Sequence, residues 1–246
     1  MEKHSFKNFK LLILILTISN LLYAQNDTIV PKNGTIVFIK KEVITDTMLF
    51  KNSYEKVFDK ALLEATKEAL MERGYKNGQI PDSISQQLNK MFAMVKSLAM
   101  EDIITNEPQN VIKYHHSYNN SEIEEFISVN DENLEKKKIT DSIDFQDDDL
   151  IVITGTEEFK NETKTIKGFK CYRVVVYYFD FGEPPGLRSL LNIMELWVTE
   201  DIKSKFHPII KSSAILEKYF PLQIKHNIKD VEGQYTSYEI LDFSLK

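Results

Sequence analysis

The sequence predicts an α+β fold: a curved antiparallel sheet, or half-barrel, with an inserted helix pair on its concave side. After residue 110, apolar and polar residues alternate in several short runs, which is the period of half-buried strands. Residues 53–104 instead carry apolar side chains at three- and four-residue spacing, as amphipathic helices do. The run 169–179 is apolar on both faces, so both need a cover. We expect the helix pair, or a sheet that curls towards a barrel, to provide it.

The first 24 residues have the composition of a cleavable signal peptide. Three lysines lie among the first ten residues, the uncharged stretch 11–24 follows, and Ala24 supplies a small residue before Gln25. A membrane anchor is the alternative, but a spanning helix needs about 20 apolar residues and this stretch is shorter. We therefore expect cleavage after Ala24 and a periplasmic or secreted protein. Its mature part, residues 25–246, should be a single β-rich domain without a transmembrane segment.

Two helices are expected to interrupt the strands. Asn52, with Glu55 three residues later, resembles a capping box, and Gly74 ends the helix that follows. The second helix begins near Ser83 and carries its own apolar stripe. Together the helices occupy about 53–104 and form an αα-hairpin inserted between strands.

The remaining elements are about eight strands joined by short turns. We expect them at residues 35–45, 112–118, 123–129, 150–154, 169–179, 193–199, 222–228 and 235–245. Residues 130–149 are rich in charge and predict a solvated loop or a fraying edge. Strands in series with short connections favour an antiparallel meander.

Composition excludes some classes of partner. The signal peptide holds three lysines and one acid, so the formal net charge of −6 for the whole chain becomes −8 for residues 25–246. Nucleic-acid binding depends on a basic surface, and anionic membranes also attract basic proteins, so we expect neither partner. The chain has one cysteine, Cys171, which forbids an internal disulfide and is expected to be a buried thiol.

Two motifs in the last third resemble a known family. Residues 163–171 read TKTIKGFKC, which resembles the TKxIxGYxC signature of the GLPGLI family of envelope proteins. Residues 197–202, WVTEDI, resemble its WYTPEI element. The resemblance covers roughly residues 150–246 and describes a divergent relative. It implies a fold similar to the lipoprotein carriers, a half-barrel with helices plugging its mouth, and it implies no catalytic residues.

No pattern in the chain predicts a catalytic or metal site. His115 and His116 are adjacent in a strand, so their side chains point to opposite faces and do not easily share an ion. Spaced metal ligands and a G-x-S-x-G motif are missing from the sequence. Paired acids such as Glu157 and Glu158 are explained by solvated loops. We therefore expect no catalytic residues, no metal and no cofactor.

The leading hypothesis is a non-enzymatic envelope protein that binds a lipid, another apolar small molecule or a lipoprotein-like partner. The first alternative is an envelope scaffold that binds a protein partner through the sheet surface and has no cavity. The second alternative is a hydrolase whose site the sequence does not expose. For the leading hypothesis, the residues expected to line an apolar cavity are Phe58, Leu62, Met91, Phe92, Val95, Val176 and Tyr178.

Overall fold

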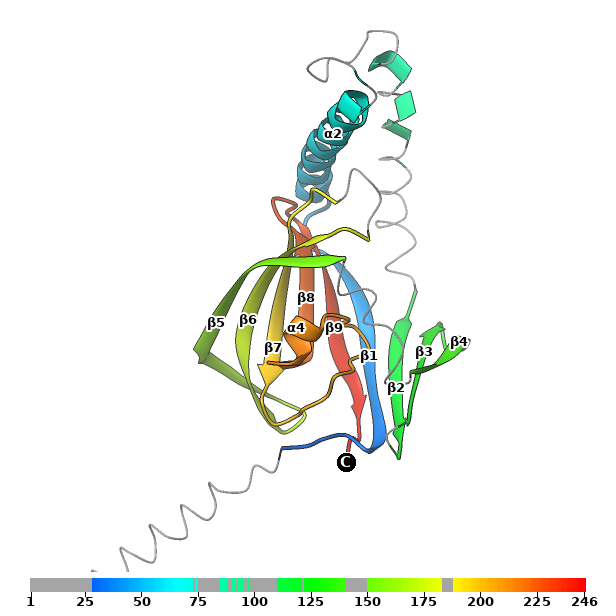
Figure 1. The fold of residues 1–246 in the computed structure, drawn as a ribbon, viewed down its shortest axis with the longest axis vertical. Coiled ribbons are helices and arrows are strands. Elements are labelled where there is room, and N and C mark those ends of the chain that lie inside the picture. The colour runs from blue at the N-terminus through cyan, green and yellow to red at the C-terminus, as the bar shows by residue number, and fades with distance from the viewer. Residues whose placement is uncertain are drawn as a thin grey trace, which may run out of the picture.

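The computed structural model describes residues 28–72, 74, 85–87, 90–91, 93–94, 97, 110–120, 122–139, 150–182 and 188–246. In this part of the chain, nine strands form one antiparallel sheet in the order β4-β3-β2-β1-β9-β8-β7-β6-β5. Figure 1 shows that the sheet is strongly curved and that the short helix α4 lies against one of its faces, called the inner face below. The curved antiparallel sheet predicted from the sequence is confirmed.

The described elements have the following bounds. The strands are β1 (Asn33–Ile44), β2 (Ile112–Asn119), β3 (Glu122–Val129), β4 (Glu132–Ile139), β5 (Ile151–Ile166), β6 (Phe169–Asp180), β7 (Asn192–Thr199), β8 (Phe220–Ile228) and β9 (Gln234–Phe243), and the helices are α2 (Thr47–Glu72) and α4 (Ser213–Leu216).

Two hairpins are closed by two-residue turns. Asn130 and Asp131 join β3 to β4, and Lys167 and Gly168 join β5 to β6, and all four residues have positive φ. Such turns match the right-handed twist of the strands that they connect. The first turn places residues 132–139 in a strand at the edge of the sheet. The charge-rich segment therefore begins as an edge strand, where charge discourages pairing with other chains.

The strand expected at 150–154 was predicted too short. β5 continues through Gly155, the predicted turn, to Ile166. Its register against β6 shifts between Ile153 and Gly155 and again between Phe159 and Thr163. Such bulges absorb extra residues and bend a strand. The chain therefore keeps pairing where the sequence pattern indicated a break.

The bent tip of the β5–β6 hairpin covers part of the outer face. Trp197 lies between Leu196 and Val198, which both belong to the inner cluster, so Trp197 points outwards. The Lys164 ammonium lies 3.8 Å from the centre of the Trp197 ring and donates a hydrogen bond to Gln223. The hairpin therefore covers part of the outer face of β7 and β8, the strands of Trp197 and Gln223.

The inner face is covered by residues 200–219, the connection from β7 to β8, called the strap below. α4 is the last part of the strap (Figure 1). The buried cluster between strap and sheet contains Val174, Val176, Tyr178, Met194, Leu196, Val198, Ile210, Ile215, Leu216, Tyr219 and Ile224. The strap thus supplies four of these eleven residues, and the other seven occupy alternating inner positions of β6, β7 and β8.

The helix pair is not confirmed on the concave side. α2 starts at Thr47 because Asp46 caps it, its Oδ1 accepting a hydrogen bond of 2.9 Å from the Leu49 N–H; the predicted cap, Asn52, lies inside the helix. In Figure 1, α2 extends beyond one end of the sheet. Its first turns pack there in a cluster of Phe50, Tyr54, Phe58, Ala61, Leu190 and Val231. The expected second helix is described only at 85–87, 90–91, 93–94 and 97.

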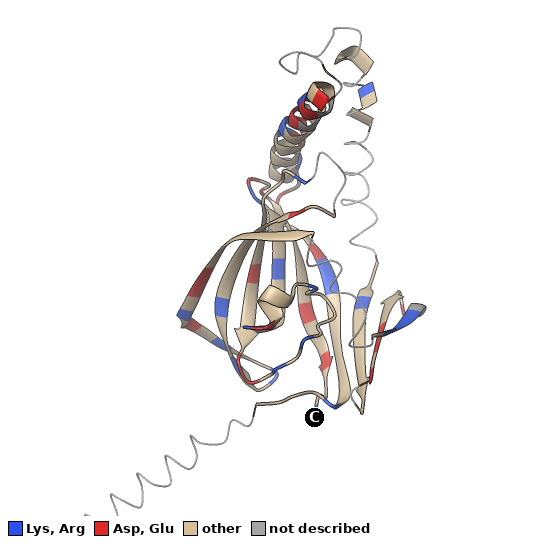
Figure 2. Ribbon diagram, viewed as in Figure 1, with Lys and Arg blue, Asp and Glu red and all other residues tan. Residues whose placement is uncertain are grey.

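Two features of the described elements concern nucleic acids and membranes, with which the sequence predicts no association. Figure 2 shows acidic and basic residues interspersed along the described strands. Of the helices that the structure describes, none is both long and apolar enough to cross a membrane.

Candidate functional site

A cavity of about 410 Å³ lies between the strap and the inner face of the sheet. It is lined by Leu150, Ile151, Tyr178, Asp180, Gly182, Met194, Ile209, Ile210, Lys211, Ser212, Ile215, Ile224, His226 and Tyr238. Most of these side chains are apolar, and polar groups are few. This size and composition are typical of small-molecule sites, which occupy about 300–1,000 Å³ and combine an apolar lining with a few placed polar groups.

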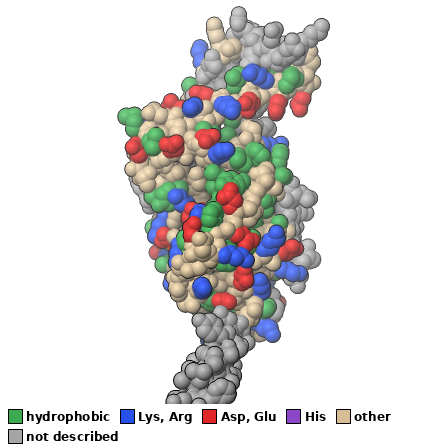
Figure 3. Space-filling view, turned by 90° about the vertical axis from the view of Figure 1, so that its left-hand side faces the viewer, with side chains coloured by type: hydrophobic (Ala, Val, Ile, Leu, Met, Phe, Trp, Pro, Cys, Tyr) green, Lys and Arg blue, Asp and Glu red, His purple; other side chains and the backbone are tan. Residues whose placement is uncertain are grey.

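The rim of the cavity is partly apolar. Leu150 lines the cavity and is 37% exposed, and Phe181 is 43% exposed. The two are joined by a hydrogen bond of 2.6 Å from the Phe181 N–H to the Leu150 carbonyl. Figure 3, which views the molecule from its β5 side, shows hydrophobic side chains gathered between charged ones on this face. Apolar groups exposed beside an apolar cavity favour entry of an apolar ligand.

One end of the cavity is polar because of His226 on β8. Its Nε2 lies 3.1 Å from the Tyr178 hydroxyl and 3.2 Å from Asn192 Oδ1. The Asn192 amide in turn donates to the carbonyl of Leu190, which fixes its orientation. His226 is only partly exposed, and burial lowers its pKa from 6.5 to about 4. The imidazole is therefore neutral at neutral pH.

A second polar group lies next to His226 on the sheet, outside the residues that line the cavity. Thr236 is the register partner of His226, and its hydroxyl donates to the Glu42 carboxylate over 2.9 Å. Glu42 also accepts a hydrogen bond of 2.7 Å from Gln234 and lies 3.1 Å from the Lys40 ammonium. The Glu42 side chain is 6% exposed, so its charge acts on this end with little screening by water.

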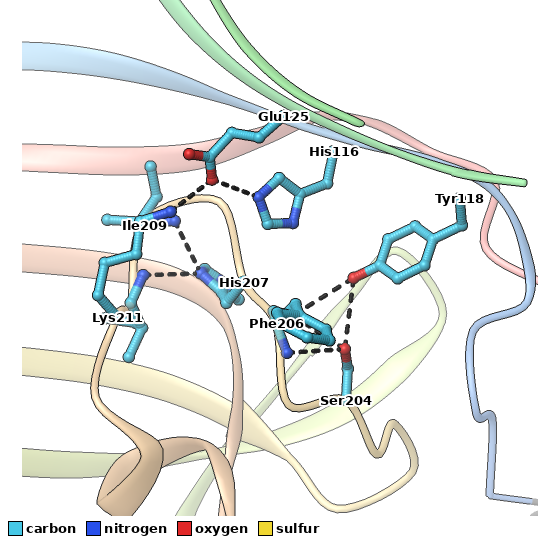
Figure 4. Close-up of polar contacts among 9 residues, drawn as sticks. His116, Tyr118, Glu125, Ser204, Phe206, His207, Ile209 and Lys211 are labelled. Atoms are coloured by element: carbon cyan, nitrogen blue, oxygen red, sulfur yellow. Dashed lines mark hydrogen bonds and ion pairs between the residues drawn. The ribbon is translucent and has the colours of Figure 1, made fainter. Parts of the chain in front are cut away.

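An ion pair at Lys211, which lines the cavity, joins the strap to the sheet (Figure 4). Lys211 of the strap donates to Glu125 on β3, which also binds His116 Nε2 on β2 over 2.5 Å. Burial opposes ionisation of Glu125, but the hydrogen bonds from His116 and Lys211 outweigh it and lower its pKa to about 2. The carboxylate stays charged and attaches the strap to β2 and β3.

His116 is the buried member of this cluster. Its side chain is 1% exposed, and its Nδ1 has no hydrogen-bond partner among the described atoms. Burial lowers the pKa of His116, and the positive charge of Lys211 lowers it further. The hydrogen bond and charge of Glu125 raise this pKa but do not outweigh burial. A neutral ring that donates through Nε2 leaves only an acceptor unpaired at Nδ1, whereas a protonated ring would leave a buried N–H unpaired. His116 is therefore neutral and out of reach of a substrate.

His207 fixes the shape of the strap. Its Nδ1 accepts hydrogen bonds of 3.1 Å from the N–H groups of Ile209 and Ile210, and its Nε2 donates to the Pro221 carbonyl over 2.9 Å. Burial lowers its pKa to about 3, so the ring is neutral and both nitrogens are satisfied. His207 therefore positions two of the isoleucines that line the cavity, as Figure 4 shows in part.

A third contact holds the start of the strap. The Tyr118 hydroxyl on β2 lies 3.3 Å from both Ser204 Oγ and the Phe206 carbonyl (Figure 4). The Ser204 hydroxyl also donates to the Phe206 carbonyl over 2.9 Å. A nucleophilic serine needs a hydrogen bond to a base. In the described part of the chain Ser204 bonds to Tyr118 and Phe206, which gives it a positioning role in the strap.

The predicted lining residues fall in different places. Val176 and Tyr178 lie in the inner cluster, and Tyr178 lines the cavity. Phe58 and Leu62 belong to the cluster at the base of α2, at one end of the sheet. Met91 is 49% exposed. Phe92 and Val95 lie outside the described residues.

The residues that sequence reasoning missed are mainly those of the strap. Ile209 and Ile210 are apolar but lie in a non-repetitive stretch, and Ile215 lies in the four-residue helix α4, which is too short to show a helical period. The sequence did contain one sign of this cover: Pro208 is followed by two isoleucines. Proline cannot take part in the middle of a sheet, so these isoleucines were more easily explained by packing against the face of a sheet. The sequence shows that His226 is a polar residue in an expected strand. That it lines a cavity could not be predicted, because the cavity is formed by the strap that covers this strand.

Neither a metal-binding cluster in the described part of the chain nor a known relative identifies the site. Among the described residues, no group of three or more His, Cys, Asp or Glu side chains is arranged to hold a metal ion. Comparison with known proteins gave no match: no family model, no curated protein and no solved structure is similar to this chain.

Proposed function

We propose that this protein is an exported, non-enzymatic binding protein that holds an apolar ligand in the cavity beneath the strap. The observation that carries the proposal is the cavity itself, about 410 Å³ with a mainly apolar lining. Leu150, one of the lining residues, is 37% exposed, so the space opens to the surface and a ligand can reach it. An accessible space of this size with a mainly apolar lining supports an apolar guest.

The attachment of the strap supports the same proposal. Lys211 with Glu125, His207 with Pro221, and Tyr118 with Ser204 hold it at separate points on the sheet. These contacts hold the strap in a fixed position over the sheet, so the space beneath it is preformed. A preformed apolar site binds a ligand without first losing conformational entropy. The proposed ligand is a lipid or another apolar small molecule, and the proposed location is the periplasm or the medium, as the predicted signal peptide and the family resemblance suggest.

Native mass spectrometry of the exported protein tests the proposal. We expect a bound species of lipid size after gentle purification, or after incubation with a lipid extract followed by gel filtration. Ile215 lines the cavity, so Ile215→Trp should fill it and lower the bound fraction at least about tenfold. Leu241 on β9 is 48% exposed and does not line the cavity, so Leu241→Trp is the matched control and should bind like the wild type.

The outcome decides between ligand binding and the scaffold alternative. A wild-type protein that stays empty in both preparations would contradict the proposal and favour a scaffold that binds its partner through the sheet surface. If Ile215→Trp and the wild type bind the ligand equally well, the ligand binds elsewhere than in this cavity.

A further inference from the structure

The polar groups that line the cavity differ in charge. Lys211 is paired with Glu125, so it contributes one half of a neutralised ion pair. His226 and Tyr178 contribute neutral side chains that are hydrogen-bonded to each other. Aliphatic groups such as Met194 and Ile224 line other parts of the cavity. A ligand with one apolar chain and one polar group fits this lining.

His226 and Tyr178 offer both hydrogen-bonding roles. A neutral imidazole carries one donor and one acceptor nitrogen, and a phenol can donate or accept. His226 lines the cavity and is partly exposed, and only its Nε2 is bonded within the described chain. Because Asn192 Oδ1 can only accept, Nε2 carries the hydrogen of the neutral ring and Nδ1 is an acceptor, to which a hydroxyl group can donate. A carboxylate can only accept and an ammonium can only donate.

The charges around His226 disfavour a charged head group. Asp180 lines the cavity, and Glu42 is the largest charge influence on His226, with Asp180 next; both carry negative charge. Lys40 acts in the opposite direction but is paired with Glu42. A carboxylate at this end would therefore meet two acids of like charge. An ammonium would be attracted to these acids, but it would lose its hydration on entering an apolar space. The acids offset this cost poorly, because both already accept hydrogen bonds from the protein.

We infer that the cavity selects single-chain amphiphiles with an uncharged hydroxyl head, which sits against His226 and Tyr178 while the chain lies along the apolar lining. This inference rests on the function proposed above and adds the chemical class of the ligand. It also gives His226 a role that packing alone does not require, because a leucine of similar size would fill an ordinary core.

Three matched probes test the inference: decanol, decanoate and decylamine share one chain and differ in the head group. Their affinities are measured at neutral pH by displacement of a fluorescent long-chain probe and by isothermal titration calorimetry. Each missing or mispaired hydrogen bond in a buried site costs about tenfold in affinity. We therefore expect decanol to bind at least about tenfold more tightly than decanoate and more tightly than decylamine.

Two variants locate the head group. Tyr178→Phe removes only a hydroxyl and should weaken decanol about fivefold to tenfold while leaving decanoate nearly unchanged. Tyr172→Phe is the matched control, because Tyr172 lies on the same strand but donates to Glu200 and does not line the cavity. His226→Leu should reduce the difference between decanol and decanoate to within about twofold.

The possible results separate this inference from the proposal on which it rests. If none of the probes binds the wild type, the proposed function fails, and the inference fails with it. If decanoate or decylamine binds as tightly as decanol, the apolar site stands and the selection for an uncharged head is wrong. If Tyr178→Phe and Tyr172→Phe behave alike towards decanol, the head group does not sit at His226.

Discussion

Acid should destabilise this protein well before its carboxylates titrate, because several histidines are buried in the neutral form. Burial lowers the pKa of His207 to about 3 and that of His226 to about 4, from 6.5 in each case. The unfolded chain takes up protons at these residues as the pH falls below 6.5, and the folded chain does not until much lower pH. The free energy of unfolding therefore decreases with falling pH across this window.

The size of the effect follows from the two shifts. Between pH 7 and pH 5, a histidine that titrates only in the unfolded state costs about 2 kcal/mol, so His207 and His226 together cost about 4 kcal/mol. His116 adds to the cost in the same direction, since burial lowers its pKa as well. Glu125 adds nothing in this range, because its titration in the folded and unfolded states lies at or below pH 4.5.

Urea unfolding at pH 7, 6 and 5 measures this loss. His226→Gln removes one titrating group, so its loss between pH 7 and pH 5 should be smaller than that of the wild type by about 2 kcal/mol. A wild-type loss below about 1.5 kcal/mol would refute the reasoning, because it would mean that these histidines take up protons in the folded state. An unchanged pH dependence in His226→Gln would refute it for His226 alone.

Three further predictions concern the strap, the leader and metal dependence. Glu125→Gln should lower the free energy of unfolding by about 1–2 kcal/mol at pH 7. The drop of the Glu125 pKa from 4.5 to about 2 corresponds to an upper limit of about 3.4 kcal/mol. The side chain is partly exposed, and screening by solvent reduces this limit. Because this pKa is lowered by folding, the difference from the wild type should disappear as the pH falls from 4.5 towards 2, and a pH-independent difference would contradict the ion-pair account. Intact-mass analysis of the exported protein should give an N-terminus at Gln25, and retention of Met1 on a membrane-bound form would contradict the predicted cleavage. Chelator treatment should leave the melting temperature unchanged, and a large drop would point to a metal site that the ligand spacing does not reveal.

The sheet could be predicted from the sequence where alternation was regular. The expected strands 169–179 and 193–199 agree closely with β6 (Phe169–Asp180) and β7 (Asn192–Thr199). β4 and the second half of β5 were missed because they are edge strands with charged side chains, which lack a buried face and hence a clear period. The turn at Asn130 and Asp131 was the only local sign that a strand would follow.

The site was harder to predict because it depends on a segment without a period. Tyr178 was expected to line a cavity between the helix pair and the sheet, and the structure places it at the space beneath the strap. The expected cover was a helix pair, whereas the described cover is the strap. Its burial depends on specific contacts, such as His207 with the backbone of Ile209 and Ile210, that no sequence pattern encodes. Regular elements can be predicted from periodicity, but a non-repetitive cover has to be observed.

A crystal structure of the protein grown with decanol tests most directly whether the space beneath the strap is a ligand site. We predict elongated density between Met194 and Ile215, with its polar end within hydrogen-bond distance of His226 or Tyr178 and the strap still attached through Lys211 and Glu125. An empty cavity, or decanol bound elsewhere on the protein, would contradict the account.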